Sequence, residues 1–155
     1  MHEDAREEVT SIRIEPDGSW YTGNRKIVNS GVLKYFRTNL HRDKKGVYIY
    51  NAFRQLKEKG YISVKGPIDL VVEFNGETFT LSSGIKIPAW EADLAMDSQG
   101  NLYIKIPKLE LWARFSRELL IELSALIEEK NNAFYFKGKE ILLYDTIPWL
   151  GSDGF

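Results

Sequence analysis

The sequence predicts an α+β protein made of two small subdomains, residues 11–66 and 67–155, each consisting mainly of antiparallel strands with one helix. Three observations lead to this prediction. Short apolar runs are separated by turn residues, as in β-hairpins. Two stretches repeat their apolar residues at helical spacing instead. Leu, Ile, Val and Phe make up 45 of the 155 residues, which is enough for a packed core.

The first predicted element is a hairpin that follows a frayed tail. Residues 1–10 are acidic and contain little apolar material, so we expect them to be flexible. From Ile12 onward, apolar and polar residues alternate up to the turn sequence at 16–18, and the β-prone residues 19–22 follow.

A first helix is predicted over residues 30–41. Its apolar residues Leu33, Phe36 and Leu40 recur at helical spacing, and His41 would interact with the exposed carbonyls of its last turn. A turn at residues 43–46 then leads into a strand at 47–50. A further strand is expected at residues 61–64.

The second subdomain is predicted to begin with a hairpin over residues 70–81. The pair Asn75-Gly76 lies between two apolar runs and favours a type I′ turn. A turn at 97–100 precedes a strand at 102–106, a long amphipathic helix is expected over 109–130, and a last hairpin over 134–143.

Two short similarities suggest an internal repeat. The Asp43-x-x-Gly46 turn resembles Asp97-x-x-Gly100. The stretch Trp20-Tyr21-x-Gly23-x-x-x-Ile27 resembles Phe136-x-Gly138-x-x-Ile141, which has one residue fewer. Two explanations stay open: a duplicated strand and helix unit, or turn chemistry that recruits Asp and Gly independently.

Charge is unevenly distributed although the net charge is only −1. Residues 34–65 contain nine basic and two acidic residues, whereas residues 68–155 contain eight basic and fourteen acidic ones. Either the two segments face one another or are solvated, or the basic segment faces an anionic partner. The balanced total argues against nucleic acid as that partner.

No catalytic residue, metal site or cofactor is predicted. The chain has no Cys and only two His, and its glycines form neither a P-loop nor a dinucleotide-binding fingerprint. Glu91, Asp93 and Asp97 lack the spacing of a calcium loop. The acidic start is unlike a signal peptide, and no apolar run approaches the roughly 20 residues of a membrane helix, so we expect a cytoplasmic protein without membrane contact.

Several short motifs occur in an order that resembles one bacterial family, domain of unknown function 1285 (DUF1285). The matching residues extend over about positions 12 to 143. They are Asp17-Gly18-Ser19-Trp20-Tyr21, Ile27, Leu33, Phe36, Leu40, Arg42-Asp43, Gly46, Tyr48, Leu102 to Ile106, Leu111, Ala113-Arg114, Ser116-Arg117, Phe136, Gly138 and Ile141.

The resemblance implies two subdomains built from a repeated strand and helix motif, and a role in signal transduction or ligand binding. It also implies one difference. The family tends to have an acidic pair before a Pro, but here Lys65-Gly66 precede Pro67, so a site that uses those acids is not expected in this chain.

The candidate site residues are the chemically distinctive ones in the matching stretches: Trp20, Tyr21, Arg42, Asp43 and Arg114. One interpretation is architectural: the two aromatic residues fill the core between the subdomains, and Arg42-Asp43 fix a turn by an ion pair and an Asx-type hydrogen bond. The other is functional: the two arginines converge on one anionic ligand or acidic partner, with Trp20 stacking beside them.

The leading functional hypothesis is a binding module, acting in bacterial signal transduction, that recognises a protein or a small anionic ligand. The alternative is an enzyme whose site is not readable from the sequence. A concave pocket with strongly perturbed pKa values would favour the enzyme.

Overall fold

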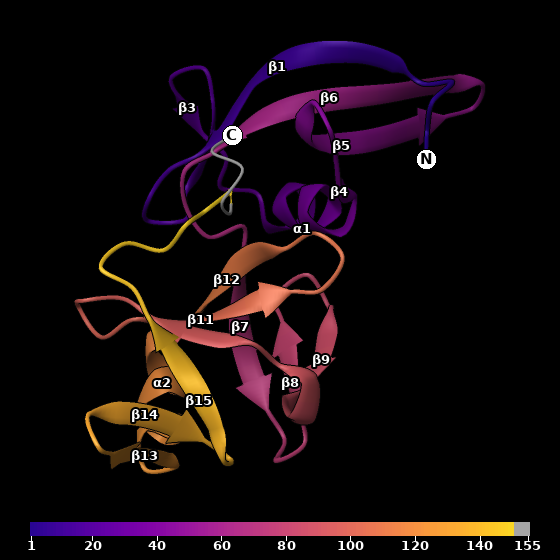
Figure 1. Ribbon diagram of the computed structural model, residues 1–155. Coiled ribbons are helices and arrows are strands. Elements are labelled where there is room, and N and C mark those ends of the chain that lie inside the picture. Colours follow the sequence, from indigo (N-terminus) through magenta and orange to yellow (C-terminus); the bar gives the residue numbers. More distant parts are fainter. Residues whose placement is uncertain (151–155) are drawn as a thin grey trace.

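The first half of the chain forms a six-stranded sheet with one helix. The computed structural model describes residues 1–150 (Figure 1). The strand order in this sheet is β3-β2-β1-β6-β5-β4. Helix α1 (Ser30–Thr38) follows β3 and lies between this sheet and the second one (Figure 1). The strands are β1 (Arg6–Ile14), β2 (Trp20–Thr22), β3 (Arg25–Lys26), β4 (Leu40–Asp43), β5 (Gly46–Phe53) and β6 (Leu56–Val64).

The second half forms a nine-stranded sheet in the order β13-β14-β15-β10-β11-β12-β7-β8-β9. The boundary predicted between residues 66 and 67 falls in the connection between the two sheets. The elements of this half are β7 (Asp69–Phe74), β8 (Thr78–Leu81), β9 (Lys86–Pro88), the 3₁₀-helix η1 (Ala89–Glu91), β10 (Leu94–Met96), β11 (Leu102–Ile106), β12 (Leu111–Phe115), α2 (Arg117–Ser124), β13 (Ile127–Lys130), β14 (Ala133–Phe136) and β15 (Lys139–Leu143).

One hydrophobic core extends through both halves. Trp20 from β2 stacks with Phe36 from α1 at a centroid distance of 6.0 Å. Phe79 and Phe115 from the second sheet meet edge to face at 5.3 Å and belong to the same buried cluster. The two halves therefore share the free energy of apolar burial instead of each having a separate core.

The expected flexible tail is wrong for residues 6–10, because β1 begins at Arg6. This part of β1 runs parallel to β6, in a register that places Arg6 opposite Glu58 and Val9 opposite Tyr61. Its pairing partner lies about fifty residues away in the chain, so local composition could not reveal the strand. The hairpin expected after it is confirmed, with Ile14 opposite Trp20.

Helix α1 is shorter than predicted and ends at Thr38. The Asn29 side chain accepts a hydrogen bond from the Val32 amide and caps its start, and Asn39 ends it. His41 is therefore not at a helix end. It lies on β4, where its ring stacks with that of Tyr48 at 5.6 Å.

The long helix predicted over residues 109–130 is wrong. The segment forms strand β12, the eight-residue helix α2 and strand β13. Trp112 and Phe115 are buried on strand β12, and Leu119 is buried on helix α2. The three residues therefore show helical spacing in the sequence although they belong to two different elements. Ser116 marks that break, because its hydroxyl caps α2 by accepting from the Leu119 amide. No helix of residues 1–150 is long and apolar enough to cross a membrane.

The α+β class is confirmed, but the sheets are mixed, because three of the pairings described for residues 1–150 are parallel: β1 with β6, β7 with β12 and β10 with β15. The structure confirms the turns predicted at residues 43–46 and 97–100, each of which joins two antiparallel strands. It also confirms the last hairpin. Parallel partners need long connections, so short-range turn signals reveal only the antiparallel pairs. The internal repeat is not confirmed and stays a prediction.

The turn after β7 is not the predicted type I′. Phe74 ends β7 and β8 begins at Thr78, so residues 75–77 form the connection. Only Gly76 in it has a positive φ, of 98°, whereas a type I′ turn needs positive φ at both central residues. The Asn75 side chain instead accepts from the amides of Glu77 and Thr78.

A close backbone approach fixes the connection between the two halves. The amide of Lys65 donates to the carbonyl of Ile14 at 2.9 Å, so the connection runs against the end of β1. A Cβ atom added at Gly66 would lie 1.9 Å from the Glu15 carbonyl oxygen. Only glycine, which has no Cβ atom, fits at position 66.

Substitution Gly66→Ala should lower the free energy of unfolding by at least about 2 kcal/mol, because the new methyl group forces the Glu15 backbone to move. Urea unfolding measures the loss. The neighbouring exposed substitution Lys65→Ala, which keeps the backbone hydrogen bond, should change stability by less than about 0.5 kcal/mol. Equal effects of the two substitutions would contradict the close approach.

Candidate functional site

Two of the predicted site residues, Trp20 and Tyr21, point to opposite faces of β2, as adjacent strand residues do. Trp20 is 1% exposed and packs in the shared core. Tyr21 is partly exposed, and the guanidinium of Arg13 lies over its ring at 4.8 Å. The two aromatic side chains therefore cannot belong to the same site.

Arg42 and Asp43 have structural contacts but do not pair with each other. The Arg42 guanidinium donates to the carbonyls of Leu109 at 3.2 Å and Leu150 at 2.6 Å. It thereby ties the end of the described chain and the β11–β12 turn to the first half. Asp43 accepts from Lys59 at 3.2 Å, and its carboxylate also accepts the Lys45 amide in the expected Asx-type bond.

Arg114 lies on β12 and donates to the Asn101 side chain at 3.0 Å. Asn101 precedes β11 at the open end of the β11–β12 hairpin, whereas Leu109, the partner of Arg42, lies in its turn. The two arginines thus contact opposite ends of one hairpin. No contact supports their convergence on one anion, and their joint role stays a hypothesis.

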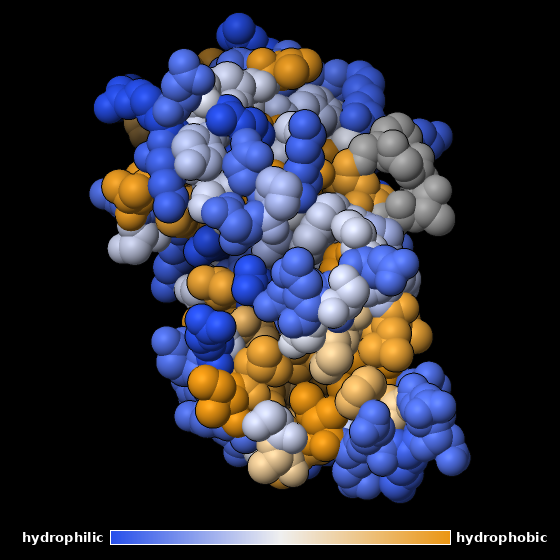
Figure 2. All heavy atoms as spheres, turned by 90° about the vertical axis from the view of Figure 1, so that its left-hand side faces the viewer, coloured by the Kyte–Doolittle hydropathy of each residue, from blue (hydrophilic) through white to orange (hydrophobic). Residues whose placement is uncertain are grey.

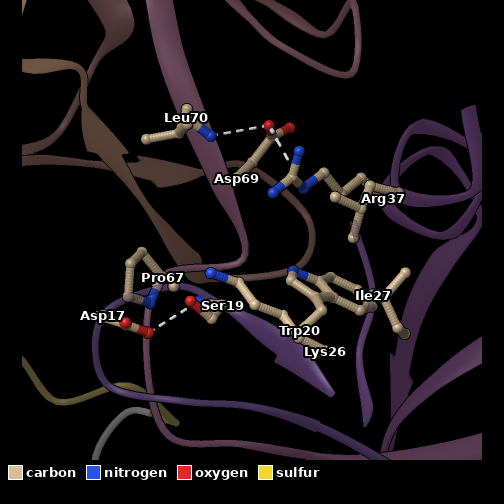
Figure 3. A pocket seen from close by; sticks show the side chains of 11 residues that line it. Asp17, Ser19, Trp20, Lys26, Ile27, Arg37, Pro67, Asp69 and Leu70 are labelled. Carbon is tan, nitrogen blue, oxygen red and sulfur yellow. Dashed lines mark hydrogen bonds and ion pairs between the residues drawn. The ribbon is translucent and has the colours of Figure 1, made fainter. Parts of the chain in front are cut away.

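The structure brings a different set of side chains together at the junction of the two halves. A pocket of about 230 Å³ opens between β2, β3, α1 and the start of β7. Its polar residues include Trp20, Lys26, Arg37 and Asp69. Figure 3 shows Trp20 and Lys26 on one side of the pocket and Arg37 with Asp69 on the other. Ile27, Leu33, Pro67 and Leu70 supply apolar walls.

The indole N–H of Trp20 is a buried donor without a partner. Nε1 is the one buried side-chain nitrogen or oxygen in residues 1–150 that has no hydrogen bond within the protein. Leaving such a donor unpaired costs about 1–3 kcal/mol. Because nearly all buried polar groups in folded proteins are satisfied, an orphan donor in a pocket indicates a place for an acceptor atom.

Arg37 and Asp69 form a buried ionic network across the junction. Asp69 on β7 accepts from the Ser82 hydroxyl at 2.6 Å and from the Ser83 hydroxyl at 2.5 Å. Arg37 on α1 donates from Nε to the Ile68 carbonyl and from Nη1 to Ser82, and its Nε lies 3.9 Å from Asp69.

The network leaves part of the Arg37 guanidinium uncommitted. Nη2 has no hydrogen-bond partner among residues 1–150. Burial lowers the pKa of Arg37, and the Asp69 charge opposes that shift. The guanidinium remains a cation because the ordinary pKa of arginine lies far above neutral pH. The pocket thus has a second donor, and this one is charged.

Lys26 and Asp17 lie in the more exposed part of the pocket. The Asp17 carboxylate accepts the Ser19 amide at 2.9 Å, which is the main reason that its pKa is lowered; the charge of Lys26 contributes. The Lys26 ammonium forms no ion pair within residues 1–150. A third donor is therefore free to meet a ligand.

Sequence reasoning found Trp20 but missed Arg37, Lys26 and Asp69. One signal was available for Arg37: it lies four residues after Leu33, on the apolar side of the amphipathic helix, where a cation needs a buried partner. No local signal distinguished Lys26 or Asp69. Their proximity depends on how the two sheets pack.

Titratable groups also gather on the other face of the first sheet. His2 stacks on Tyr50 at 3.6 Å and meets His41 edge to face at 4.8 Å. Burial lowers the pKa of His41, and the nearby His2 adds to the shift. Beside them, burial and the hydrogen bond to Asp43 raise the pKa of Tyr61.

Two of the acidic residues between positions 91 and 97 have partners within the protein. Asp93 forms an ion pair with Lys139 at 3.1 Å, and the Asp97 carboxylate accepts from Asn101 and from the Tyr103 hydroxyl. Burial and that bond raise the pKa of Tyr103 to about 12. Within residues 1–150, no group of three or more His, Asp or Glu side chains has the geometry of a metal site.

Fold and pocket together define a small α+β protein with a ligand-sized pocket at the junction of two mixed sheets. No known protein-family profile and no curated protein matches the sequence.

Two solved structures of DUF1285 family proteins do match in fold. One, from Silicibacter pomeroyi DSS-3, is 22% identical, with a TM-score of 0.67; the match covers 92% of this chain and 84% of the other. The second, from Shewanella baltica OS155, is 16% identical, with a TM-score of 0.55, and covers 75% and 91% of the two chains. The resemblance to DUF1285 seen in the sequence motifs is confirmed at the level of the fold.

Substitution Asp69→Asn should lower the free energy of unfolding by about 3–5 kcal/mol, because it leaves the Arg37 cation, whose side chain is only 13% exposed, without its counter-charge. Chemical denaturation measures the loss. The matched control Asp93→Asn, which breaks an exposed ion pair, should cost about 0–1 kcal/mol. In an Arg37→Met background, Asp69→Asn should cost less than in the native chain; strict additivity would contradict the network.

The stability of the protein should fall as the pH drops through the ordinary His pKa of about 6.5. The pKa of His41 is lowered in the folded state, so the unfolded chain takes up the proton first and gains free energy relative to the folded one. Urea unfolding between about pH 7.5 and 5.5 measures this. His41→Phe keeps an aromatic ring on Tyr48 and should flatten the profile; an unchanged slope would contradict the assignment.

Proposed function

We propose that this protein is a non-enzymatic binding module that holds a small anionic molecule in the junction pocket, and that the molecule is a carboxylate with a short apolar body. One observation carries the proposal: the unpartnered Nε1 donor of buried Trp20 lines a pocket that also contains two cationic side chains.

The donors around the pocket call for a ligand that offers only acceptors. The Trp20 indole N–H, the Arg37 Nη2 group and the Lys26 ammonium all donate, and none of these groups accepts. A carboxylate presents two acceptor oxygens and a negative charge, and hydrogen bonds between ionised partners are about twice as strong as neutral ones. Arg37 is held in place by Ile68 and Ser82, so it is preorganised for such a contact.

The size and walls of the pocket restrict the rest of the ligand. At about 230 Å³ the pocket is smaller than the 300–1,000 Å³ that is usual for drug-sized ligands. Ile27, Leu33, Pro67 and Leu70 would contact the apolar body. The two carboxylates in the lining, Asp17 and Asp69, are occupied by an amide and by hydroxyls, which leaves the cations to receive the ligand.

The pKa shifts in the pocket favour binding over catalysis. Among the pocket residues, the shifted pKa values belong to Asp17 and Arg37, and both shifts are downward, so neither group becomes an acid or base that exchanges protons near neutral pH. The enzyme alternative would need such a group beside the ligand.

A binding module of this kind suits bacterial signal transduction. The pocket is lined by residues of both halves, with Trp20 and Lys26 from the first and Pro67, Asp69 and Leu70 from the second. Ligand binding would therefore change the stability of the junction, and a partner protein that contacts both halves would sense that change.

Thermal unfolding with a series of small carboxylates and their neutral amides tests the proposal. A carboxylate at about 100 times its dissociation constant stabilises the fold by about 2.7 kcal/mol, which corresponds to a rise of roughly 5–10 °C in the midpoint. The matching amides should have a much smaller effect. If no carboxylate raises the midpoint more than its amide does, the proposal is wrong.

Variants then locate the site. Lys26→Gln removes an exposed cation with no ion pair, and Trp20→Phe removes the indole donor but keeps an aromatic ring. Each should weaken carboxylate binding about tenfold or more, measured by calorimetry. The control Lys86→Gln, an exposed cation outside the pocket, should bind as the native protein does. Equal binding by all three variants would contradict this location.

A further inference from the structure

Besides the junction pocket, the second half of the molecule has another surface that could bind a partner. Figure 2 shows apolar side chains gathered over the lower half, which contains β14 and β15. A hollow of about 500 Å³ lies there. Met96, Phe134, Leu143 and Tyr144 line it together with the carboxylates Asp97 and Asp145.

The lining of the hollow combines apolar and acidic side chains. Leu143 is 54% exposed although it ends a strand of the core sheet. Asp145 is exposed and its side chain has no ion pair within residues 1–150, and no cationic residue lines the hollow. An occupant would therefore combine a large apolar side chain with a positive charge.

The chain itself presents such an element at the tip of the β5–β6 hairpin. Phe53 and Leu56 are the last cross-strand pair, and each is 63% exposed. Arg54 follows Phe53 in the turn, with its guanidinium 5.3 Å from the centre of that ring. Arg54 forms no ion pair within residues 1–150.

The tip and the hollow lie far apart in one molecule. The β5–β6 hairpin extends away from α1 in the upper half, whereas β14 and β15 lie on the opposite side of the lower half (Figure 1). The tip cannot reach the hollow of its own chain. A second copy can supply it.

We propose that the hairpin tip of one molecule, Phe53, Arg54 and Leu56, docks into the Met96, Phe134 and Leu143 hollow of a second copy, with Arg54 facing Asp145. The contact is heterologous, because different surfaces of the two copies meet, and it leaves one tip and one hollow free at the two ends of each pair. Association then continues head to tail. The charge contrast between the two surfaces, with Arg54 at the tip and Asp145 at the hollow, favours this orientation.

The contact is small, so the association is weak and salt-dependent. Sedimentation equilibrium of the native protein over a wide range of concentrations measures it. The average mass should rise steadily above that of a dimer at high protein concentration and fall when salt is added. A native protein that stays monomeric at the highest concentration would overturn the proposal.

Two surface substitutions each remove one side of the proposed contact. Phe53→Ser removes the aromatic side chain of the tip, and Leu143→Ser removes an apolar side chain of the hollow. Each should lower the association constant about tenfold or more. The control Val28→Ser, at an exposed apolar residue outside both surfaces, should associate as the native protein does. Thermal unfolding and circular dichroism verify that all variants fold.

Mixing the two variants gives the decisive result. The Phe53→Ser chain keeps an intact hollow and the Leu143→Ser chain keeps an intact tip, so an equimolar mixture should form heterodimers that do not grow further. A mixture that stays monomeric while the native protein associates would show that tip and hollow are not partners. Growth of either variant alone to the native extent would overturn the proposal as well.

Discussion

The buried network of Arg37 and Asp69 is the interaction on which the arrangement of the two halves depends. A carboxylate on β7 is buried and a cation on α1 is largely withdrawn from water, which is costly unless the two are paired and hydrogen-bonded. Ser82, Ser83 and the Ile68 carbonyl supply the necessary hydrogen bonds. These partners come from one short stretch of the second half, so the network is complete only when α1 lies against that sheet in one orientation.

The same network shapes the pocket. Because Arg37 is fixed from one side by Ile68 and Ser82, the rest of its guanidinium faces the space beside Trp20. Trp20 is held by stacking on Phe36, one residue before Arg37 on the helix. Core packing therefore positions the Trp20 donor, and the ionic contact positions the neighbouring Arg37 donor. Because residues of both halves line the pocket, it forms only when the two halves pack together. The fold accepts one unpaired indole donor at this place and satisfies the other buried side-chain polar groups of residues 1–150.

The candidate site was only partly predictable. Trp20 stood out because a tryptophan in a matching motif is chemically distinctive, and the Asx-type bond of Asp43 followed from turn chemistry. The functional interpretation placed an anion between Arg42 and Arg114 because these arginines belong to matching motifs, yet both donate to groups of the protein itself. Arg37, Lys26 and Asp69 come from three separated stretches, and no spacing rule brings them together before the sheets are packed.

The sequence by itself determined the class of the protein and most of its hairpins, because a turn depends on residues within four or five positions of each other. Only the tertiary structure decided the parallel pairings, the strand at residues 6–10 and the break of the segment 109–130 into strand, helix and strand. Each of these depends on partners tens of residues away, whose burial outweighs local helical spacing or polar composition. The pocket belongs to this second group, since its walls come from two sheets that pack against one core.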